Sequence, residues 1–174
     1  MEAAGLARRA SGGSFPLIGV APATEIAPHG QTLIDPNHSH IVAVRNPKAP
    51  ANDAWGSETD TMYWLFARLA EGRPSVAVVA NGGRITVQEV AANVQAGRPI
   101  VLVEGSGRAA DALASLVRGT RPVDREVADL REQAEKAELM RRPELFRIVS
   151  LQSGAAGLRS AIADAIDGRA PREH

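Results

Sequence analysis

The chain contains no cysteine among its 174 residues. Disulfide bonds, thiol nucleophiles and cysteine-ligated metal sites are therefore excluded. No apolar stretch approaches the roughly 18 to 20 residues that span a bilayer. The apolar run within residues 1–22 is too short, and too interrupted by glycine and proline, for a signal peptide. We therefore expect no association with a membrane and a cytoplasmic location.

The chain also lacks an excess of charge, because 20 basic side chains balance 20 acidic ones. Without a net positive field, nucleic acid and anionic membranes are disfavoured as partners. The sequence has no Gly-x-Ser-x-Gly nucleophile elbow, and no lysine follows its glycine clusters as in a phosphate-binding P-loop. The length is that of one ordinary domain, so we expect a single domain over residues 1–174.

Short apolar runs alternate with helical patterns along most of the chain. Strands are predicted at 15–22, 40–44, 74–80, 99–103 and 145–151, and helices at 2–10, 57–69, 86–97, 108–117, 124–142 and 154–166. This alternation predicts an α/β fold of Rossmann-like type, with a mainly parallel sheet, right-handed crossovers and helices on both faces.

Two helix starts are predicted from capping boxes, Ser57 with Asp60 and Thr86 with Glu89. The charged segment 124–142 places its apolar residues on one stripe, which is typical of a helix with one solvated face. That stripe consists of Val127, Leu130, Ala134 and Ala137.

The most distinctive stretch is "VLVEGSGRAAD", in which a valine-rich strand runs directly into a glycine-rich corner and a helix. Gly105 and Gly107 let the backbone approach a ligand, and Ser106 is suited to capping the helix or donating to an oxygen. Arg108 adds a planar fork that matches phosphate, next to the positive end of the helix dipole. We interpret the corner as a phosphate cradle; the alternative is a turn that needs glycine only for tight packing.

Glu104 ends the valine-rich strand, where an unsolvated carboxylate would cost several kcal/mol, so a ribose hydroxyl is a candidate partner. In parallel sheets, ligands bind outside the carboxyl ends of the strands, where loops from neighbouring strands meet. The polar or glycine-rich segments 19–22, 81–83 and 104–108 all fall on that edge. We therefore expect these three loops to lie together.

The segment "DPNHSH" places His38 and His40 two residues apart, with Asp35 and Asn37 nearby. A metal site lacks a clear third ligand here, so we expect none. Contact with a ligand and a polar turn around a partly buried histidine remain as alternatives, and the turn is favoured.

Five blocks of the sequence resemble a known family, and they occur in order over roughly residues 15–117. The blocks are "IGVAP" (18–22), "LIDPNHSHIVAV" (33–44), "WGSE" (55–58), "VAVVANGG" (76–83) and "VLVEGSGRAADALA" (101–114). They resemble the amino-terminal cytosolic region of melastatin-type TRPM channels, known as the LSDAT domain, and its prokaryotic stand-alone relatives. That group belongs to the SLOG superfamily, which also contains the cytokinin-activating phosphoribohydrolases.

The resemblance implies a Rossmann-like sheet that binds a nucleotide-derived small molecule such as ADP-ribose or a cyclic relative. It implies no cofactor. The candidate ligand-binding residues are Gly19, Ala21, Asn37, His38, Asn81, Gly82, Gly83, Glu104, Gly105, Ser106, Gly107 and Arg108.

The sequence departs from the family in two respects. We expect the family's first strand and its glycine-rich loop to be missing before residue 2. Three explanations stay open: a start further upstream, an incomplete pocket, or a pocket closed by another subunit. The sheet edge that would be unpaired favours a homo-oligomer or instability. The "PGGxGTxxE" motif of the phosphoribohydrolases is not reproduced by "EGSGRAAD". A binding or sensing domain is therefore the leading hypothesis. The alternatives are a hydrolase of an N-glycosidic bond with Glu104 as its catalytic residue, and an assembly role for residues 124–142.

Overall fold

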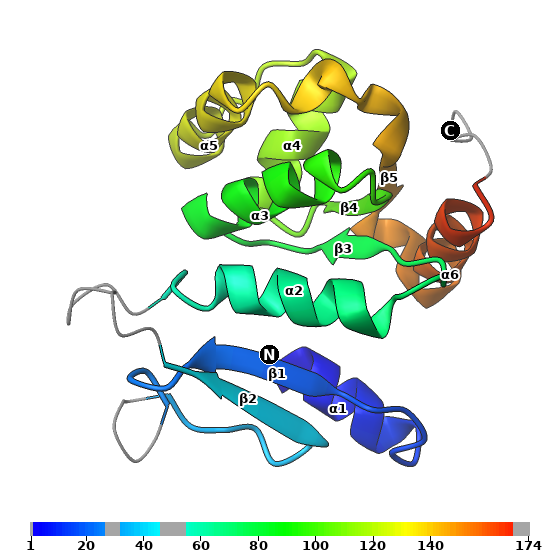
Figure 1. Cartoon of the computed structure of the whole chain (residues 1–174). Coiled ribbons are helices and arrows are strands. Elements are labelled where there is room, and N and C mark those ends of the chain that lie inside the picture. The colour runs from blue at the N-terminus through cyan, green and yellow to red at the C-terminus, as the bar shows by residue number, and fades with distance from the viewer. Residues whose placement is uncertain (1, 27–31, 46–54, 169–174) are drawn as a thin grey trace. The chain divides into compact units, whose positions relative to one another are not determined.

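A computed structural model describes residues 2–26, 32–45 and 55–168 of the chain (Figure 1). Its contacts divide into two compact units, residues 1–71 (unit 1) and residues 72–174 (unit 2), and each unit is described by itself. None of the described helices has the length and apolar character that crossing a membrane requires.

Unit 1 contains one pair of parallel strands and two helices. Its elements are α1 (Glu2–Ala10), β1 (Ile18–Pro22), β2 (His40–Val44) and α2 (Thr59–Leu69). Strands β1 and β2 pair in register, with Ile18 opposite His40. Helix α1 and strand β2 have the predicted bounds. The predicted capping box at Ser57 is wrong, because the N-cap residue of α2 is Glu58, whose carboxylate accepts from the Gly56 amide at 2.7 Å instead of capping the helix.

Helix α1 is fastened to the turns around the β1–β2 pair by a single guanidinium. Arg8 donates to the carbonyl oxygens of Phe15 at 2.9 Å, Asn37 at 3.1 Å and Gly13 at 3.3 Å. Three loop carbonyls thereby gain a charge-assisted donor from one side chain. The turn before β2 is thus held by a residue of the first helix.

Unit 2 contains a three-stranded parallel sheet in the order β3-β4-β5. Its elements are β3 (Ala77–Val79), α3 (Arg84–Gln95), β4 (Ile100–Glu104), α4 (Arg108–Arg118), α5 (Arg125–Lys136), β5 (Phe146–Ser150) and α6 (Gly154–Ile166), with short 3-10 helices η1 (Leu139–Arg141), η2 (Pro143–Leu145) and η3 (Leu151–Ser153).

The central strand β4 separates two apolar clusters on opposite faces of the sheet. Ile100 and Leu102 are fully buried in a cluster with residues of α3, α4 and α5. Val101 and Val103 pack instead with residues of α6. Because side chains alternate between the faces of a strand, this division places α3, α4 and α5 on one face and α6 on the other. The prediction of a parallel α/β fold with helices on both faces is confirmed.

Several predicted boundaries differ from the structure. The described strands form a two-stranded and a three-stranded sheet, and β3 is shorter than the predicted 74–80. Thr86 is not an N-cap, since α3 begins at Arg84 and the Thr86 hydroxyl accepts from the Gly83 amide at 3.2 Å. The helix predicted over 124–142 ends at Lys136, because Glu138 has a left-handed backbone with φ of 53° that a helix cannot continue through.

Gly5 tests the packing of α1. Replacing glycine by alanine inside a helix normally stabilises it by about 0.5–1 kcal/mol. Here a Cβ atom at Gly5 would lie 1.8 Å from Oδ2 of Asp35, so we expect Gly5→Ala to lower the free energy of unfolding, by about 1–3 kcal/mol. Urea denaturation measures the change. The control is Ala7→Gly at an exposed position of α1, where only the ordinary propensity loss of about 0.5–1 kcal/mol is expected. A stabilised Gly5→Ala protein would contradict this packing.

Candidate functional site

The loops that follow β3 and β4 are hydrogen-bonded to each other. The Asn81 amide donates to the Ser106 hydroxyl at 2.8 Å. In return, the amides of Ala109 and Ala110, in the first turn of α4, donate to the carbonyls of Gly82 at 3.3 Å and Asn81 at 3.1 Å. The structure thus brings together two of the three predicted loops, residues 81–83 and 104–108. The third, residues 19–22, belongs to unit 1.

Left-handed backbone shapes both loops. Gly105 and Gly107 have φ of 87° and 99°, and Gly82 has φ of 95°. Such values suit glycine, so these residues are required by the chain path. Two non-glycine residues, Asn81 with φ of 59° and Arg108 with φ of 49°, adopt the same region. Left-handed backbone outside glycine costs about 1–2 kcal/mol per residue, which the hydrogen bonds between the loops help to offset.

Ser106 and Asp111 are committed to holding the corner in place. The Ser106 hydroxyl donates to the Val103 carbonyl at 2.6 Å while it accepts from Asn81. The Asp111 carboxylate accepts from the Gly105 amide at 2.7 Å. Because a hydroxyl has a single hydrogen to donate, Ser106 holds the loops together and has no proton left for a ligand.

The backbone amides that are free at this edge differ from those that the sequence predicted at the start of α4. The Ala109 and Ala110 amides of α4 are used by the 81–83 loop. The backbone amides of Gly107 and Arg108 have no acceptor among the described residues. The neighbouring helix α3 begins at Arg84, and its first-turn amides lack carbonyl partners one turn earlier. Both helix starts can thus contribute backbone donors at this edge.

The two charged side chains singled out in the sequence are paired with neighbouring helices. Arg108 donates to Glu126 of α5 at 2.7 Å, and the two side chains are 49% and 57% exposed. Arg118, at the end of α4, donates from Nε and Nη2 to the two carboxylate oxygens of Glu104, each at 3.1 Å. Exposed ion pairs contribute about 0–1 kcal/mol, so both pairs exchange readily for a ligand group.

A hollow of about 530 Å³ lies between the starts of α3 and α4 and helix α5, and we call it the α5 hollow. Its volume is within the roughly 300–1,000 Å³ range of small-molecule sites. Its lining carries three cationic and three acidic side chains, together with Leu130 and Gln133. These charged residues are Arg84, Arg108, Lys136, Glu126, Asp129 and Glu132.

The contribution of α5 was missed in the sequence, where its polar side was interpreted as solvated. The lining residues Glu126, Asp129, Gln133 and Lys136 recur at intervals of three or four, which places them on one side of the helix. Gln133 donates from Nε2 to the Arg84 carbonyl at 3.2 Å, which joins α5 to the start of α3. The Lys136 ammonium, bonded to Glu132 at 2.7 Å, lowers the pKa of that carboxyl. The three- and four-residue spacing of these polar side chains was the signal in the sequence that could have revealed this side of α5.

The candidate residues of unit 1 form a compact polar turn. Asp35 accepts from the amide and the side chain of Asn37 at 2.9 and 2.8 Å. The His38 side chain is 4% exposed, with Nδ1 3.6 Å from Oδ2 of Asp35. A Cβ atom at Gly19 would lie 3.1 Å from the His38 ring and 2.9 Å from Ile41, so that glycine makes room for the ring.

These contacts favour the turn interpretation of residues 35–40. Ala21, the remaining candidate in β1, is buried. No group of three or more histidine or acidic side chains in the described parts of the chain is arranged to hold a metal ion. Contact of Gly19, Asn37 or His38 with a ligand stays a prediction.

The contribution of the turn around Asp35 to the free energy of unfolding should decrease at low pH. The hydrogen bond from the Asn37 amide lowers the pKa of Asp35 below its usual value of 3.8, against the opposing effect of burial. Its contribution to stability is therefore complete above that value and is lost as the pH falls through the folded-state pKa. We expect Asp35→Asn to flatten the fall of unfolding free energy that begins below about pH 5 and continues down through the folded-state pKa of this carboxyl. Urea titrations at each pH, with the exposed Asp60→Asn as control, measure it. An unchanged slope would refute this assignment.

Substitution of Gly82 tests whether the 81–83 loop packs against Thr86. A Cβ atom there would lie 2.5 Å from Oγ1 of Thr86, on a backbone with φ of 95°. Gly72 has φ of 68° with nothing within 4 Å of its Cβ position, so Gly72→Ala carries the backbone strain without the clash. We expect Gly82→Ala to destabilise the protein by about 1–3 kcal/mol more than Gly72→Ala. Equal losses in thermal or urea denaturation would mean that the 81–83 loop is not packed against Thr86.

One family model matches the chain, and its description is "SLOG in TRPM, prokaryote". The match covers residues 1–158, which include all of unit 1, most of unit 2 and every candidate residue named above. Among curated proteins, none matches the chain.

Proposed function

Since this chain belongs to the family described as SLOG in TRPM, prokaryote, we propose that it binds a nucleotide-derived ligand such as ADP-ribose in unit 2. The phosphate would lie at the starts of α3 and α4, and the rest of the ligand in the α5 hollow. The observation that carries this proposal is the hydrogen-bonded pair of loops, which sets Arg84 and Arg108 at the mouth of one hollow.

The donors at this position suit an anionic group. Arg84 and Arg108 are the first residues of their helices, so two guanidinium groups and two helix dipoles act on the same hollow. A helix N-terminus carries about half a positive charge, and an arginine fork binds phosphate oxygens in pairs. Together these groups favour phosphate over a neutral ligand.

The acidic residues of α5 suit the hydroxyl groups of a sugar. Glu126 and Asp129 line the same hollow, and ionised carboxylates only accept hydrogen bonds. Ribose hydroxyls are donors, whereas phosphate oxygens are not. A ligand with both groups therefore satisfies the mixed charge of this hollow better than inorganic phosphate alone.

Binding of phosphate by Arg108 requires it to leave Glu126. A doubly charged phosphate attracts the guanidinium more strongly than one half-exposed carboxylate does. Glu126 thus competes with the ligand for Arg108. We therefore expect replacement of Arg108 to weaken ligand binding and replacement of Glu126 to strengthen it.

The matched variants are Arg108→Gln and Glu126→Gln, with Arg125→Gln as control. We expect Arg108→Gln to weaken ADP-ribose binding by about 10- to 100-fold, the value of a charge-assisted pair. Glu126→Gln should strengthen it by up to about fivefold, because a surface ion pair no longer competes. Calorimetry with ADP-ribose, cyclic ADP-ribose, NAD and AMP measures both. Arg125 is exposed and does not line the hollow, so its variant should bind like wild type.

Failure has two forms. If none of these nucleotides binds the folded protein, the proposal is wrong. If ADP-ribose binds and Arg108→Gln has wild-type affinity, the phosphate lies elsewhere.

Cleavage of the ligand is the alternative, with Glu104 as its catalytic residue. Both Glu104 oxygens accept from Arg118, so that guanidinium must move before the carboxylate can exchange a proton. Chromatography after incubation with nucleoside monophosphates separates the two functions, since only a hydrolase releases free base. A cytoplasmic location and a homo-oligomeric state, as the sequence predicts, are part of the same proposal.

A further inference from the structure

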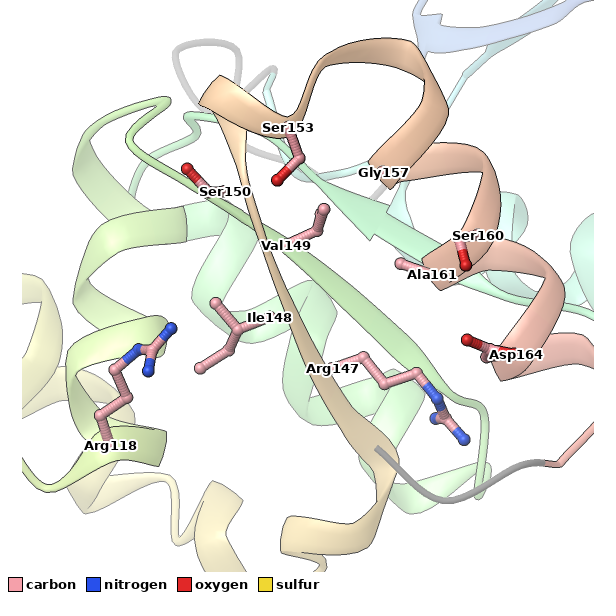
Figure 2. A pocket seen from close by; sticks show the side chains of 10 residues that line it. All are labelled: Arg118, Arg147, Ile148, Val149, Ser150, Ser153, Gly157, Ser160, Ala161 and Asp164. Atoms are coloured by element: carbon pink, nitrogen blue, oxygen red, sulfur yellow. The ribbon is translucent and has the colours of Figure 1, made fainter. Parts of the chain in front are cut away.

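The outer edge of β5 borders a hollow of about 380 Å³, which we call the β5 slot (Figure 2). It is lined by residues 147–150 of β5, by Arg118 at the end of α4, and by residues between 153 and 164 in η3 and α6. It shares no lining residue with the α5 hollow. The β5 slot is therefore separate from the nucleotide site proposed above.

The slot faces the edge of β5 and not one of its faces. Four consecutive residues, 147–150, line it, and consecutive side chains of a strand point to opposite faces. A hollow on one face would touch only every second residue. In the described chain no strand pairs with this edge, since β5 ends the order β3-β4-β5. Within the described residues, this edge of β5 is therefore not covered by another strand.

The slot has a wall on each side of the sheet. Ile148 packs against the cluster of α3, α4 and α5, and Arg118 extends that side beyond the strand. Val149 packs in the cluster of α6, whose residues Gly157 and Ala161 form the opposite wall (Figure 2). Two walls flanking a strand edge leave the space that a further strand of the sheet would occupy.

We propose that the β5 slot binds an extended peptide segment of a partner protein, which adds to the sheet as a strand beside β5. In this mode the main chain supplies the pairing, and pockets for alternate side chains supply specificity. We expect the bound peptide to carry an acidic side chain on the side that faces Arg118 and small side chains on the side that faces α6.

The acidic preference follows from the charges of the lining. Arg118 uses Nε and Nη2 for Glu104, and its Nη1 has no acceptor among the described residues. It is 46% exposed, so an incoming carboxylate reaches it without burial of a charge. Arg147 and Asp164 are buried, so the half-exposed Arg118 is the charged lining residue that an incoming side chain would meet. An acidic side chain complements its guanidinium.

The preference for small side chains follows from the α6 wall. That wall presents Gly157, Ser160 and Ala161 (Figure 2). A Cβ atom at Gly157 would lie 2.3 Å from the Cβ of Ser153, so the helix surface is already closely packed there. Arg147 and Asp164, each 8% exposed, close the lower part of the same side. Small side chains such as alanine or serine would let a strand approach this wall closely.

A second copy of the chain complements the slot less well. Antiparallel pairing of two β5 strands about a twofold axis at Ile148 keeps each face of the sheet continuous. The Arg118 side chains of both copies would then lie on the same face beside the axis. Like charges placed in this way are repulsive, so the peptide is the favoured occupant.

The test uses the full chain and three capped heptapeptides. The first, Ala-Thr-Ala-Asp-Ala-Thr-Ala, places a central acid on the Arg118 side and alanine on the α6 side. The second has lysine at the centre, and the third repeats the first with N-methylated alanines that cannot pair with a strand. We expect the acidic peptide to bind about tenfold more tightly than the lysine peptide, and the methylated peptide not to bind. Fluorescence anisotropy measures affinity, and hydrogen exchange of residues 147–149 measures pairing.

The matched variants are Arg118→Gln, which should abolish the difference between the acidic and lysine peptides, and Arg159→Gln, which should preserve it. Arg159 is exposed on α6 and does not line the slot. Protection by the acidic peptide should fall on the amides of β5 and not on those of β3. Three results would overturn the proposal: equal affinity for acidic and lysine peptides, unchanged binding after N-methylation, or concentration-dependent protection of β5 without peptide, which would identify a second copy as the occupant. None of these results depends on nucleotide binding, which is measured separately.

Discussion

The hydrogen bond from the Asn81 amide to the Ser106 hydroxyl joins the ends of two parallel strands, and the geometry of unit 2 depends on it. Neighbouring loops in a parallel sheet otherwise leave their strands independently. Here the same two loops also exchange backbone bonds through the Ala109 and Ala110 amides. The result is that α3 and α4 begin side by side, and that Arg84 and Arg108 line one hollow. Together these hydrogen bonds hold the two helix starts next to each other.

Charge pairing between elements balances two of the charged residues at the carboxyl edge. Glu104 pairs with Arg118, and Arg108 pairs with Glu126. These pairs are about half exposed, so water screens them and their exchange costs little. In the binding proposed above, the phosphate would take the place of Glu126 as the partner of Arg108.

Much of the fold follows from local pattern, and the errors have local causes too. The strands were predictable because valine-rich runs between glycines suit a buried parallel strand, and β4 is buried on both faces. The capping boxes failed because a Ser or Thr followed three residues later by an acid also occurs where another residue begins the helix, as at Gly83. The charged helix was predicted to continue past Lys136, since composition does not show that Glu138 takes a left-handed conformation. A polar side of a helix such as that of α5 is equally consistent with exposure to solvent and with lining a hollow. Only the packing of α5 beside α3 and α4 shows that it lines a hollow.

By itself the sequence determined the class of fold and the glycine corners, because periodicity and backbone freedom act between residues that are near in the chain. Its five blocks also indicated the family, through their resemblance to known members. Only the tertiary structure decided which side chains meet. Arg108 lies 18 residues from Glu126, and Glu104 lies 14 residues from Arg118. No local pattern specifies such pairs, since they form where helices packed on a common sheet face bring distant residues within hydrogen-bonding distance. Ser106 is a further example. Its residue type suggested a ligand contact, whereas its hydroxyl is bonded to Asn81 and Val103 and holds the two loops together.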